Sequence, residues 1–430
     1  MTNSALLEEW NDLSDLERVE AFESLPRDRA DGFFLQLSSR DQVRLLLALP
    51  GERRIWLRLL PPDDAADVLQ LAPKEERDSL AAQLDDVTRR EVNALLAYKE
   101  DAAGGLMNPR FARLRPDMAI DEAISYLRHQ ASHVESIYYA YALDEAQHLL
   151  GVVGFRDLFA ADRSKLVRDI MRTKFISVSE QTDQEAVARL FSKHHLLAIP
   201  VLDPQGRMRG IVTADDIVDV VEQEASEDIQ KVGGMEALDG PYLHIRFWQM
   251  VKKRAGWLTI LFVGEMLTAT AMGYFEQEIA RAVVLALFVP LIISSGGNSG
   301  SQATTLVIRA MALGELRLRD WWRVISREFS TGLALGSVLA VIGMTRIVLW
   351  QAIWKPYGPH YVVIASTVAC SLVGVVLFGT IAGSMLPFAL RRVGLDPASA
   401  SAPFVATLVD VTGLMIYFSI ASVILKGSLL

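Results

Sequence analysis

The chain of 430 residues contains a single cysteine, Cys370, and only seven histidines. One cysteine excludes an internal disulfide and any metal site built from several thiolates. The sequence also lacks a phosphate-binding glycine loop, a nucleophile beside a base and a histidine-rich metal motif. His194 and His195 are adjacent in the sequence, so their side chains point apart on a helix or strand. We therefore expect no enzyme activity.

The amino-terminal segment, MTNSALLEEWNDL, lacks the apolar core of a signal peptide, so we expect it to stay in the cytosol. Positive charge is scarce in residues 1–240, which carry 28 Lys and Arg against 44 Asp and Glu, whereas residues 241–430 carry 15 against 8. This deficit of positive charge argues against nucleic acid as a partner and is compatible with the binding of divalent cations. The composition predicts an acidic soluble half followed by a membrane half.

Residues 1–100 contain a repeat of 11 or 12 residues. Its apolar markers are Leu25, Leu37, Leu49, Leu60, Ala72 and Leu84. Pro, Ser or Asp follows each marker, as suits the start of a helix, and acidic residues often occupy the next turn, where the helix dipole favours them. The pattern predicts a stack of short helices, a small α-solenoid, with a structural or interaction role.

Residues 101–230 contain a second, longer repeat. GLMNPRFARLRPDMAIDEAISYLR (105–128) matches DIMRTKFISVSEQTDQEAVARLF (169–191), and LLGVVGFRDLF (149–159) matches MRGIVTADDIV (208–218). Short β-rich runs alternate with helical patterns in both copies. Two tandem copies with this ending resemble a pair of CBS domains, which are α+β sensory modules that often bind adenine nucleotides.

The CBS resemblance implies a ribose-binding pattern in which Thr or Ser stands three residues before an Asp, just after a strand. The second copy has Thr213 and Asp216, whereas the first copy has Gly154 before Asp157 and lacks the hydroxyl. The resemblance therefore points to Thr213 and Asp216 as a nucleotide site, with ATP as the regulatory ligand.

The segment IVTADDIVDVVEQEASEDIQ (211–230) places many acidic residues on one predicted helix. They are Asp215, Asp216, Asp219, Glu222, Glu224, Glu227 and Asp228. Carboxylates three or four residues apart are neighbours on a helix, and like charges at that spacing are destabilising. A bridging Mg²⁺ or Ca²⁺ would remove that cost, because both ions prefer oxygen ligands. A solvated acidic face is the alternative explanation.

Five apolar stretches in the second half are long enough to cross a hydrocarbon core of about 30 Å. They cover residues 257–275, 282–311, 329–350, 361–390 and 402–425. A basic amphipathic segment, HIRFWQMVKKRAGW (244–257), precedes the first stretch and suits the cytosolic membrane surface. Basic residues also concentrate after the second and fourth spans. We therefore expect a cytosolic amino terminus and an external carboxyl terminus.

Polar residues interrupt these spans at three places. The second span contains PLIISSGGNSGSQATTLVIR (290–309), Asp410 lies in the last span, and Glu265 lies in the first. A buried acid in a membrane needs a partner or an ion, and a carboxylate with water molecules suits hydrated Mg²⁺. We expect Asp410 to hold an ion, whereas pairing, protonation and a functional role all stay open for Glu265.

The sequence resembles the MgtE family of bacterial magnesium channels in two long motifs, PLIISSGGNSGSQATTLVIRAMALGE (290–315) and LDPASASAPFVATLVDVTG (395–413). The resemblance implies a homodimer whose pore lies at the subunit interface and is lined by the second and fifth spans. It implies that Asp410 is the pore carboxylate and that residues 244–256 form a plug helix. The other pore-lining positions that it implies are Asn298, Ser301, Gln302, Thr305 and Ala406.

In the family, cytosolic Mg²⁺ binds acids between the helical domain, the CBS pair and the plug, and closes the pore. The resemblance implies this role for the seven acids of residues 215–228, with Asp85, Asp86 and Glu91 as loosely matched partners in the helical domain. Ala402 and Ser301 stand where relatives carry Asn, which leaves ion selectivity open.

These features predict a multidomain membrane protein. Its expected parts are an N-terminal α-solenoid (1–100), a tandem CBS pair with the acidic connector (101–230), a linker with the amphipathic plug helix (231–256) and a five-helix transmembrane domain (257–430). We expect a homodimeric, Mg²⁺-selective channel in the lipid of the bacterial cytoplasmic membrane, closed by cytosolic Mg²⁺. The alternatives are a broader or ion-coupled transporter of Co²⁺, Ni²⁺ or Mn²⁺ and a membrane-anchored nucleotide sensor, although polar spans argue against a mere anchor.

Overall fold

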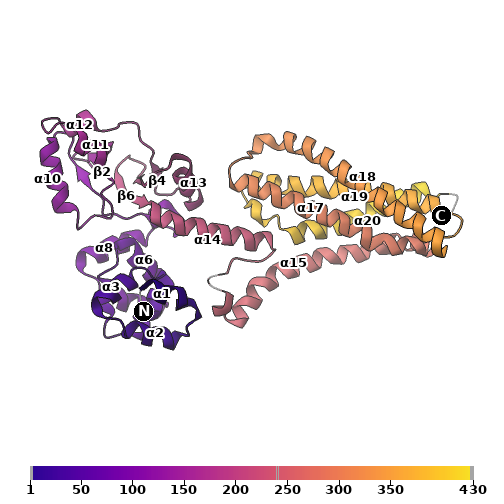
Figure 1. Ribbon diagram of the computed structural model, residues 1–430, viewed down its shortest axis with the longest axis horizontal. Helices are drawn as coiled ribbons and strands as arrows, with labels where there is room; N and C mark the ends of the chain where they lie inside the picture. Colours follow the sequence, from indigo (N-terminus) through magenta and orange to yellow (C-terminus); the bar gives the residue numbers. More distant parts are fainter. Residues whose placement is uncertain (1–2, 239, 241, 427–430) are drawn as a thin grey trace. The chain divides into compact units, whose positions relative to one another are not determined.

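The computed structural model describes residues 3–238, 240 and 242–426. The chain folds as two compact units, Met1–Glu222 and Gln223–Leu430 (Figure 1). Helix α14 (Ala214–Val232) begins in the first unit and ends in the second.

The first unit begins with short helices whose starts are set by caps and prolines, as the repeat predicts. They are α1 (Asn3–Glu9), η1 (Trp10–Asp12), α2 (Asp15–Glu23), α3 (Arg27–Phe34), α4 (Ser39–Ala48), α5 (Arg53–Leu57), α6 (Pro62–Leu71), α7 (Lys74–Ala81) and α8 (Asp86–Leu95). Ser38 and Asp85 accept hydrogen bonds from N–H groups in the first turns of α4 and α8. The repeat markers Leu60 and Leu84 are buried in a shared core, so the predicted stack of helices is confirmed.

Two small sheets with the same strand order follow in the first unit. The first copy contains α9 (Ala103–Leu106), β1 (Arg113–Leu114), α10 (Ile120–Gln130), β2 (Tyr139–Leu143), β3 (Leu149–Gly154) and α11 (Phe155–Ala160). The second contains α12 (Val167–Ile170), β4 (Val178–Ser179), α13 (Gln184–His194), β5 (Ala198–Leu202), β6 (Met208–Thr213) and the start of α14. In each sheet a parallel pair is followed by an antiparallel hairpin, which confirms the internal repeat.

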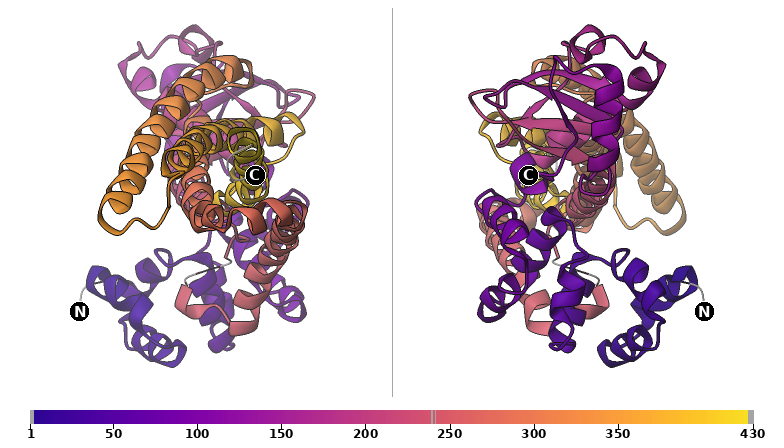
Figure 2. Two further views of the ribbon diagram at one scale, coloured as in Figure 1. Left: turned by 90° about the vertical axis from the view of Figure 1, so that its right-hand side faces the viewer. Right: turned by 90° about the vertical axis from the view of Figure 1, so that its left-hand side faces the viewer.

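The second unit contains five helices that are long and apolar enough to cross a membrane, counted over the described residues. They are α15 (Phe247–Tyr274), α17 (Val289–Ala312), α18 (Trp321–Trp354), α19 (Tyr361–Arg392) and α20 (Ala402–Ile424). Short helices connect them: η2 (Tyr242–His244), α16 (Glu276–Arg281), η3 (Val283–Phe288), η4 (Leu318–Asp320) and η5 (Pro397–Ser399). Figure 2, left, looks along this bundle, in which α18 lies on the outer side and packs on α19.

The basic amphipathic segment is not a separate helix. Helix α15 runs without a break from Phe247 to Tyr274, so the segment expected as a plug helix continues directly into the first span. None of the α15 residues is buried, whereas α17, α19 and α20 each bury one face. Helix α15 is therefore the least packed of the five.

Helices α17 and α19 pack so closely that their backbones touch. A Cβ atom added at Gly379 of α19 would collide with the carbonyl oxygen of Gly296 of α17, and Gly383 meets Gly300 in the same way. Thr304 of α17 donates a hydrogen bond to the carbonyl oxygen of Gly383 at 2.8 Å. Part of the polar stretch in the second span is thus structural, because small and hydroxyl residues join membrane helices.

Candidate functional site

Asp410 lies near the middle of α20, the last span. Ser401 caps this helix by accepting a hydrogen bond from the N–H of Phe404, and Val409 beside Asp410 is buried in the bundle core. Asp410 itself is half-buried. A carboxyl group at this depth in a bilayer is costly unless it meets water, a partner or an ion.

Helix α17 also packs on α20, along a face that adjoins its contact with α19, since Cβ atoms at Gly296 and Gly300 would meet residues of both helices. Ser301 Oγ donates a hydrogen bond to the carbonyl oxygen of Ala402 at 3.2 Å, and Gly297 lies against Ala406. The structure therefore brings two predicted pore residues, Ser301 and Ala406, to the contact between the second and fifth spans.

Three other predicted pore residues, Asn298, Gln302 and Thr305, are exposed on α17. Their spacing of four and three residues places them on one helix face, and we call them the polar stripe. Asn298 donates to Ser294 Oγ at 3.4 Å, and Thr305 donates to the carbonyl oxygen of Ser301 at 2.9 Å. These hydrogen bonds stay within α17, so the stripe has room for further polar partners.

A cluster of carboxylates in the first unit joins α6 to the start of α14, and we call it the acidic cluster. Its members are Asp63, Asp64, Asp67, Glu135, Asp215, Asp216 and Asp219. Burial, together with the neighbouring carboxylates, raises the pKa of Asp64 to about 6 and the pKa of Asp67 and of Asp216 to about 7. Like charges thus crowd a partly buried contact between two helices.

Neutral and cationic partners relieve only part of this repulsion. Asn108 Nδ2 donates to Asp63 Oδ1 at 3.0 Å and to Glu135 Oε2 at 2.8 Å. Burial raises the pKa of Glu135, and the charge of Arg110 offsets part of that rise. Arg110 is itself paired with Glu91 at 2.8 Å. The acidic cluster therefore keeps an excess of negative charge when its members are ionised.

Four of the seven predicted sensing acids lie further along α14 than the acidic cluster. Glu222 is exposed and, after burial, contributes to the raised pKa of Asp219. Glu227 is paired with Lys231, and Glu224 and Asp228 have interaction partners as well. Of the predicted set, Asp215, Asp216 and Asp219 are brought to the acids of α6.

The partners in the helical part differ from those expected. Asp85 caps α8 by accepting from the N–H groups of its first turn, Asp86 pairs with Arg89 at 2.5 Å, and Glu91 pairs with Arg110. A sensing role for Asp85, Asp86 and Glu91 stays a prediction, whereas the acids that the structure brings against the start of α14 are those of α6. Their spacing in PDDAAD is a usable sequence signal, since three and four residues put carboxylates on one helix face.

No three His, Cys, Asp or Glu side chains within the described ranges are grouped so that they would hold a metal ion directly. Mg²⁺ keeps several of its waters and is usually bound through one or two carboxylates. The acidic cluster fits this kind of binding, in which hydrated ions bridge α6 and α14.

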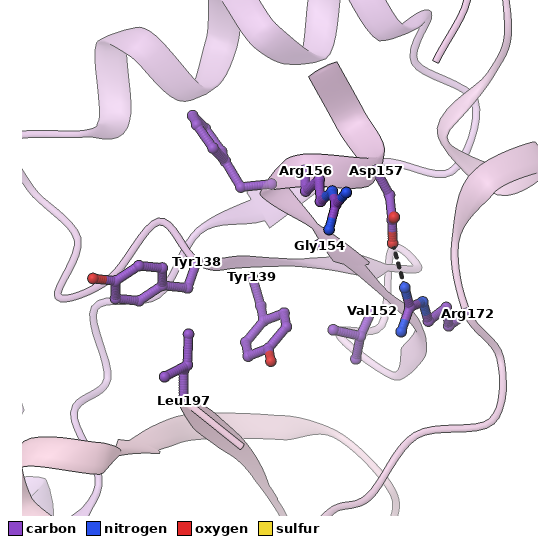
Figure 3. Close-up of a pocket in the computed structure, with 9 residues that line it drawn as sticks. Tyr138, Tyr139, Val152, Gly154, Arg156, Asp157, Arg172 and Leu197 are labelled. Atoms are coloured by element: carbon purple, nitrogen blue, oxygen red, sulfur yellow. Dashed lines mark hydrogen bonds and ion pairs between the residues drawn. The ribbon is translucent and has the colours of Figure 1, made fainter. Parts of the chain in front are cut away.

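A cavity of about 460 Å³ opens on the first sheet (Figure 3). Its lining consists of Tyr138, Tyr139, Val152, Gly154, Phe155, Arg156, Asp157, Arg172 and Leu197. Arg172 Nη2 is paired with Asp157 Oδ2 at 2.7 Å, and Figure 3 shows this pair on one side with Tyr138 and Tyr139 opposite. Aromatic faces and guanidinium groups together suit a ligand with a ring and phosphates.

The predicted nucleotide residues Thr213 and Asp216 do not line this cavity. Thr213 Oγ1 donates to Asp216 Oδ2 at 2.7 Å, and Asp216 belongs to the acidic cluster. The cavity instead includes Gly154 and Asp157, from the copy that lacks the hydroxyl. A nucleotide site at Thr213 and Asp216 stays a prediction.

Inside the second unit, an ion pair holds the end of α14 next to the start of α20. Lys231 Nζ is paired at 2.6 Å with Oδ2 of Asp396, the residue that caps η5, and Trp257 Nε1 donates to Ser401 Oγ at 3.1 Å. The end of α14 and Trp257 of α15 therefore both contact residues that lead into the helix of Asp410.

Family profiles match consecutive parts of the chain. The MgtE intracellular N domain matches residues 1–101, the CBS domain matches 103–164 and 167–223, and MgtE, described as a divalent cation transporter, matches 289–420. The inosine-5'-monophosphate dehydrogenase of Bacillus subtilis (strain 168) is 29% identical over 240 residues, 54% of this chain and 44% of that enzyme. This partial likeness reflects the CBS domains and does not make the chain an enzyme.

Magnesium transporters called MgtE resemble the chain over most of its length. The one from Thermus thermophilus is 41% identical over 426 residues, 98% of this chain and 93% of that protein. The one from Enterococcus faecalis is 35% identical over 340 residues, 78% and 72% of the two chains. The cytosolic domain of the Mg²⁺ channel MgtE, solved in complex with ATP, is 40% identical, covers 51% of this chain and 90% of its own, and has a TM-score of 0.48.

The family resemblance, the fold class and the expectation of a non-enzyme are thereby confirmed. With its five candidate spans, this chain belongs to the MgtE family of membrane-embedded magnesium transporters.

Proposed function

We propose that two copies of this chain form a Mg²⁺-selective channel that is closed by cytosolic Mg²⁺. The observation that carries the proposal is Asp410, a half-buried carboxyl group in the middle of a membrane span. Two such carboxylates, one from each copy, attract a hydrated dication without stripping its waters, which Mg²⁺ gives up reluctantly.

The polar stripe supports a pore between two copies. Asn298, Gln302 and Thr305 are exposed in the single chain, and polar groups that face lipid are costly. A second copy placed against this face would line a water-filled path with amide and hydroxyl groups. The stripe and Asp410 lie on helices that contact each other, so one path can pass both.

The loop charges support an orientation for the channel in the cytoplasmic membrane. Arg317, Arg319, Arg323 and Arg327 follow the second span, and Arg391 and Arg392 follow the fourth. Basic loops stay on the cytosolic side. With five spans, this side also holds the amino-terminal unit, and the carboxyl terminus lies outside.

The acidic cluster supports control by cytosolic Mg²⁺. Without cations, its ionised carboxylates repel each other across the contact between α6 and α14. Bound hydrated Mg²⁺ removes that repulsion and favours the compact arrangement. Helix α14 passes this change towards the membrane bundle, where Lys231 is paired with Asp396.

The cavity of the first sheet supports ATP as a regulatory ligand. Arg156 and Arg172 are suited to phosphate oxygens, while Tyr138 and Tyr139 offer aromatic faces to a base. Asp157 is now paired with Arg172 and would accept from a ribose hydroxyl if Arg172 turned to the phosphates.

Mg²⁺ uptake into liposomes that contain the full-length protein tests the pore assignment. Asp410→Asn keeps the shape of the side chain but removes its charge, and we expect uptake to fall at least about tenfold, a change worth about 1.4 kcal/mol. Glu315→Gln, an exposed loop acid, serves as the control. Mg²⁺ uptake by Asp410→Asn at the wild-type rate would contradict the proposal.

Patch-clamp recording with titrated cytosolic Mg²⁺ tests the gating. Opening should fall as Mg²⁺ rises, and a response absent over the whole range would show that the acidic cluster does not control the pore. The same recordings decide the alternative: currents that follow proton or sodium gradients, or that Co²⁺, Ni²⁺ and Mn²⁺ carry equally, indicate a coupled or broader transporter.

A further inference from the structure

The first and fifth spans, α15 and α20, run side by side in the same direction. They touch at three levels, which are Trp257 with Ser401, Gly264 with Thr407, and Phe275 with Phe418. At the middle level the approach is close: a Cβ atom on Gly264 would lie 2.9 Å from Thr407 Cγ2. These pairs fix the register of the two helices.

This register places Glu265 of α15 level with Asp410 of α20. Glu265 follows the contact residue Gly264, and Asp410 lies three residues beyond Thr407. The close contact of Gly264 with Thr407 brings the two carboxyl groups near enough for the charge of Glu265 to act on Asp410. Two acidic groups therefore meet at one depth of the membrane.

In the part of the chain that the structure describes, Glu265 lacks the burial and the ion pairs that a structural role would require. No residue of α15 is buried, and Glu265 is exposed in the single chain. No salt bridge to a Lys, Arg or His is found for Glu265 or Asp410 within the described residues. An acid exposed to hydrocarbon is costly, so Glu265 needs a wet surface, and the ion path at Asp410 provides one.

We infer that Glu265 is a second carboxylate of the ion site at Asp410 and that it strengthens the preference for divalent over monovalent cations. The inference rests on the proposed function of Asp410. Each copy then contributes two carboxylates instead of one. Because Coulomb energy is proportional to the charge of the ion, removing one carboxylate weakens the binding of a dication twice as much, in free energy, as that of a monovalent ion.

The test uses full-length protein in liposomes, with Mg²⁺ uptake and Na⁺ permeation measured for each variant. For Glu265→Gln we expect the half-saturating Mg²⁺ concentration to rise about tenfold, and Na⁺ binding to weaken only about threefold, as the charge scaling requires. Glu265→Asp keeps the charge and should stay near wild type. Glu276→Gln, an exposed acid of α16 beyond the span, should not differ from wild type.

A charge-restoration experiment removes any doubt about folding. Glu265→Cys is made in a Cys370→Ser background, so that it carries the only thiol, and is treated with a negatively charged methanethiosulfonate reagent. Returning a negative charge to the folded protein should restore most of the lost Mg²⁺ affinity, and saturating Mg²⁺ should slow the reaction. A neutral reagent of similar size should restore nothing.

The outcomes separate this inference from the pore assignment. An unchanged half-saturating Mg²⁺ concentration and an unchanged Mg²⁺ to Na⁺ ratio in Glu265→Gln overturn the role of Glu265, while loss of uptake in Asp410→Asn still stands. Uptake retained in Asp410→Asn overturns the proposed function itself. An equal gain from the charged and the neutral reagent also overturns the inference, because it shows a packing effect.

Discussion

Asp67→Asn removes one charge from the acidic cluster and should stabilise the first unit at neutral pH in the absence of Mg²⁺. Burial, followed by the charges of Asp64, Glu100 and Asp216, raises the pKa of Asp67 to about 7. The value in an unfolded chain is about 3.9, so the folded state prefers the protonated form. A difference of about three pKa units corresponds to about 4 kcal/mol.

The direction of the pH dependence follows from this raised pKa. The folded state binds the proton more tightly than the unfolded chain, so the stabilisation is complete below about pH 4 and is lost as the pH rises through about 7. The advantage of Asp67→Asn over wild type should therefore be near zero at pH 4 and reach about 4 kcal/mol at pH 8 with a chelator. Saturating Mg²⁺ should reduce it, because bound cations offset the same charge.

Hydrogen exchange of the full-length protein measures this effect locally, because the opening free energies of peptides from α6 and α14 are obtained directly. Asp78→Asn, an exposed aspartate of α7, is the matched control and should change little. The reasoning is refuted if Asp67→Asn gives no added protection at pH 8, or if it gives the same protection at pH 4 and pH 8.

Three other substitutions have defined outcomes. Gly379→Ala should lower the stability of the bundle by about 2–4 kcal/mol in thermal unfolding, since its methyl group meets a carbonyl oxygen of α17, whereas Gly374→Ala meets only side-chain ends at 3.3 Å and should be tolerated. Lys231→Met breaks the pair with Asp396 and should shift channel closure to higher cytosolic Mg²⁺ in patch-clamp records; normal closure would show that the pair does not transmit the signal. Arg156→Ala should weaken ATP binding about tenfold in calorimetry, the loss of one charged phosphate contact, and unchanged binding would move the ligand away from this cavity.

Much of the fold follows from local signals in the sequence. Pro, Ser and Asp at regular spacing mark the helix starts of the first hundred residues because they satisfy or dispense with free N–H groups, and Ser38 and Asp85 do so in the structure. The five spans follow from the length of their apolar runs. The two copies of the sheet follow from an internal match that needs no structural information.

The functional contacts were harder to predict because they depend on which faces pack together. In the sequence, Asp64 looks like an ordinary first-turn acid and Asp67 like an acid of a solvated helix face, and only tertiary packing brings them to α14. The same holds for the second span, where Gly300 and Thr304 join α19 but Asn298 and Gln302 stay exposed. The sequence shows that residues 290–309 are unusually polar. Only the three-dimensional structure shows which of them pack against α19 and which are exposed.

The direct backbone contact between α17 and α19 limits how this transporter can move. Gly379 and Gly383 of α19 are followed by Thr380 and Ser384, so sliding α19 along α17 by a single residue would push a Cβ atom into a space that now holds a carbonyl oxygen. Helices α17 and α19 thus form a rigid pair that resists relative sliding. Helix α15 is held less tightly: it buries none of its residues, and its close approach to α20 at Gly264 is to the side chain of Thr407 and not to backbone, so it can shift at the lowest cost in packing. Under the gating proposed above, the movement would be a tilt of α15 against the fixed pair of α17 and α19.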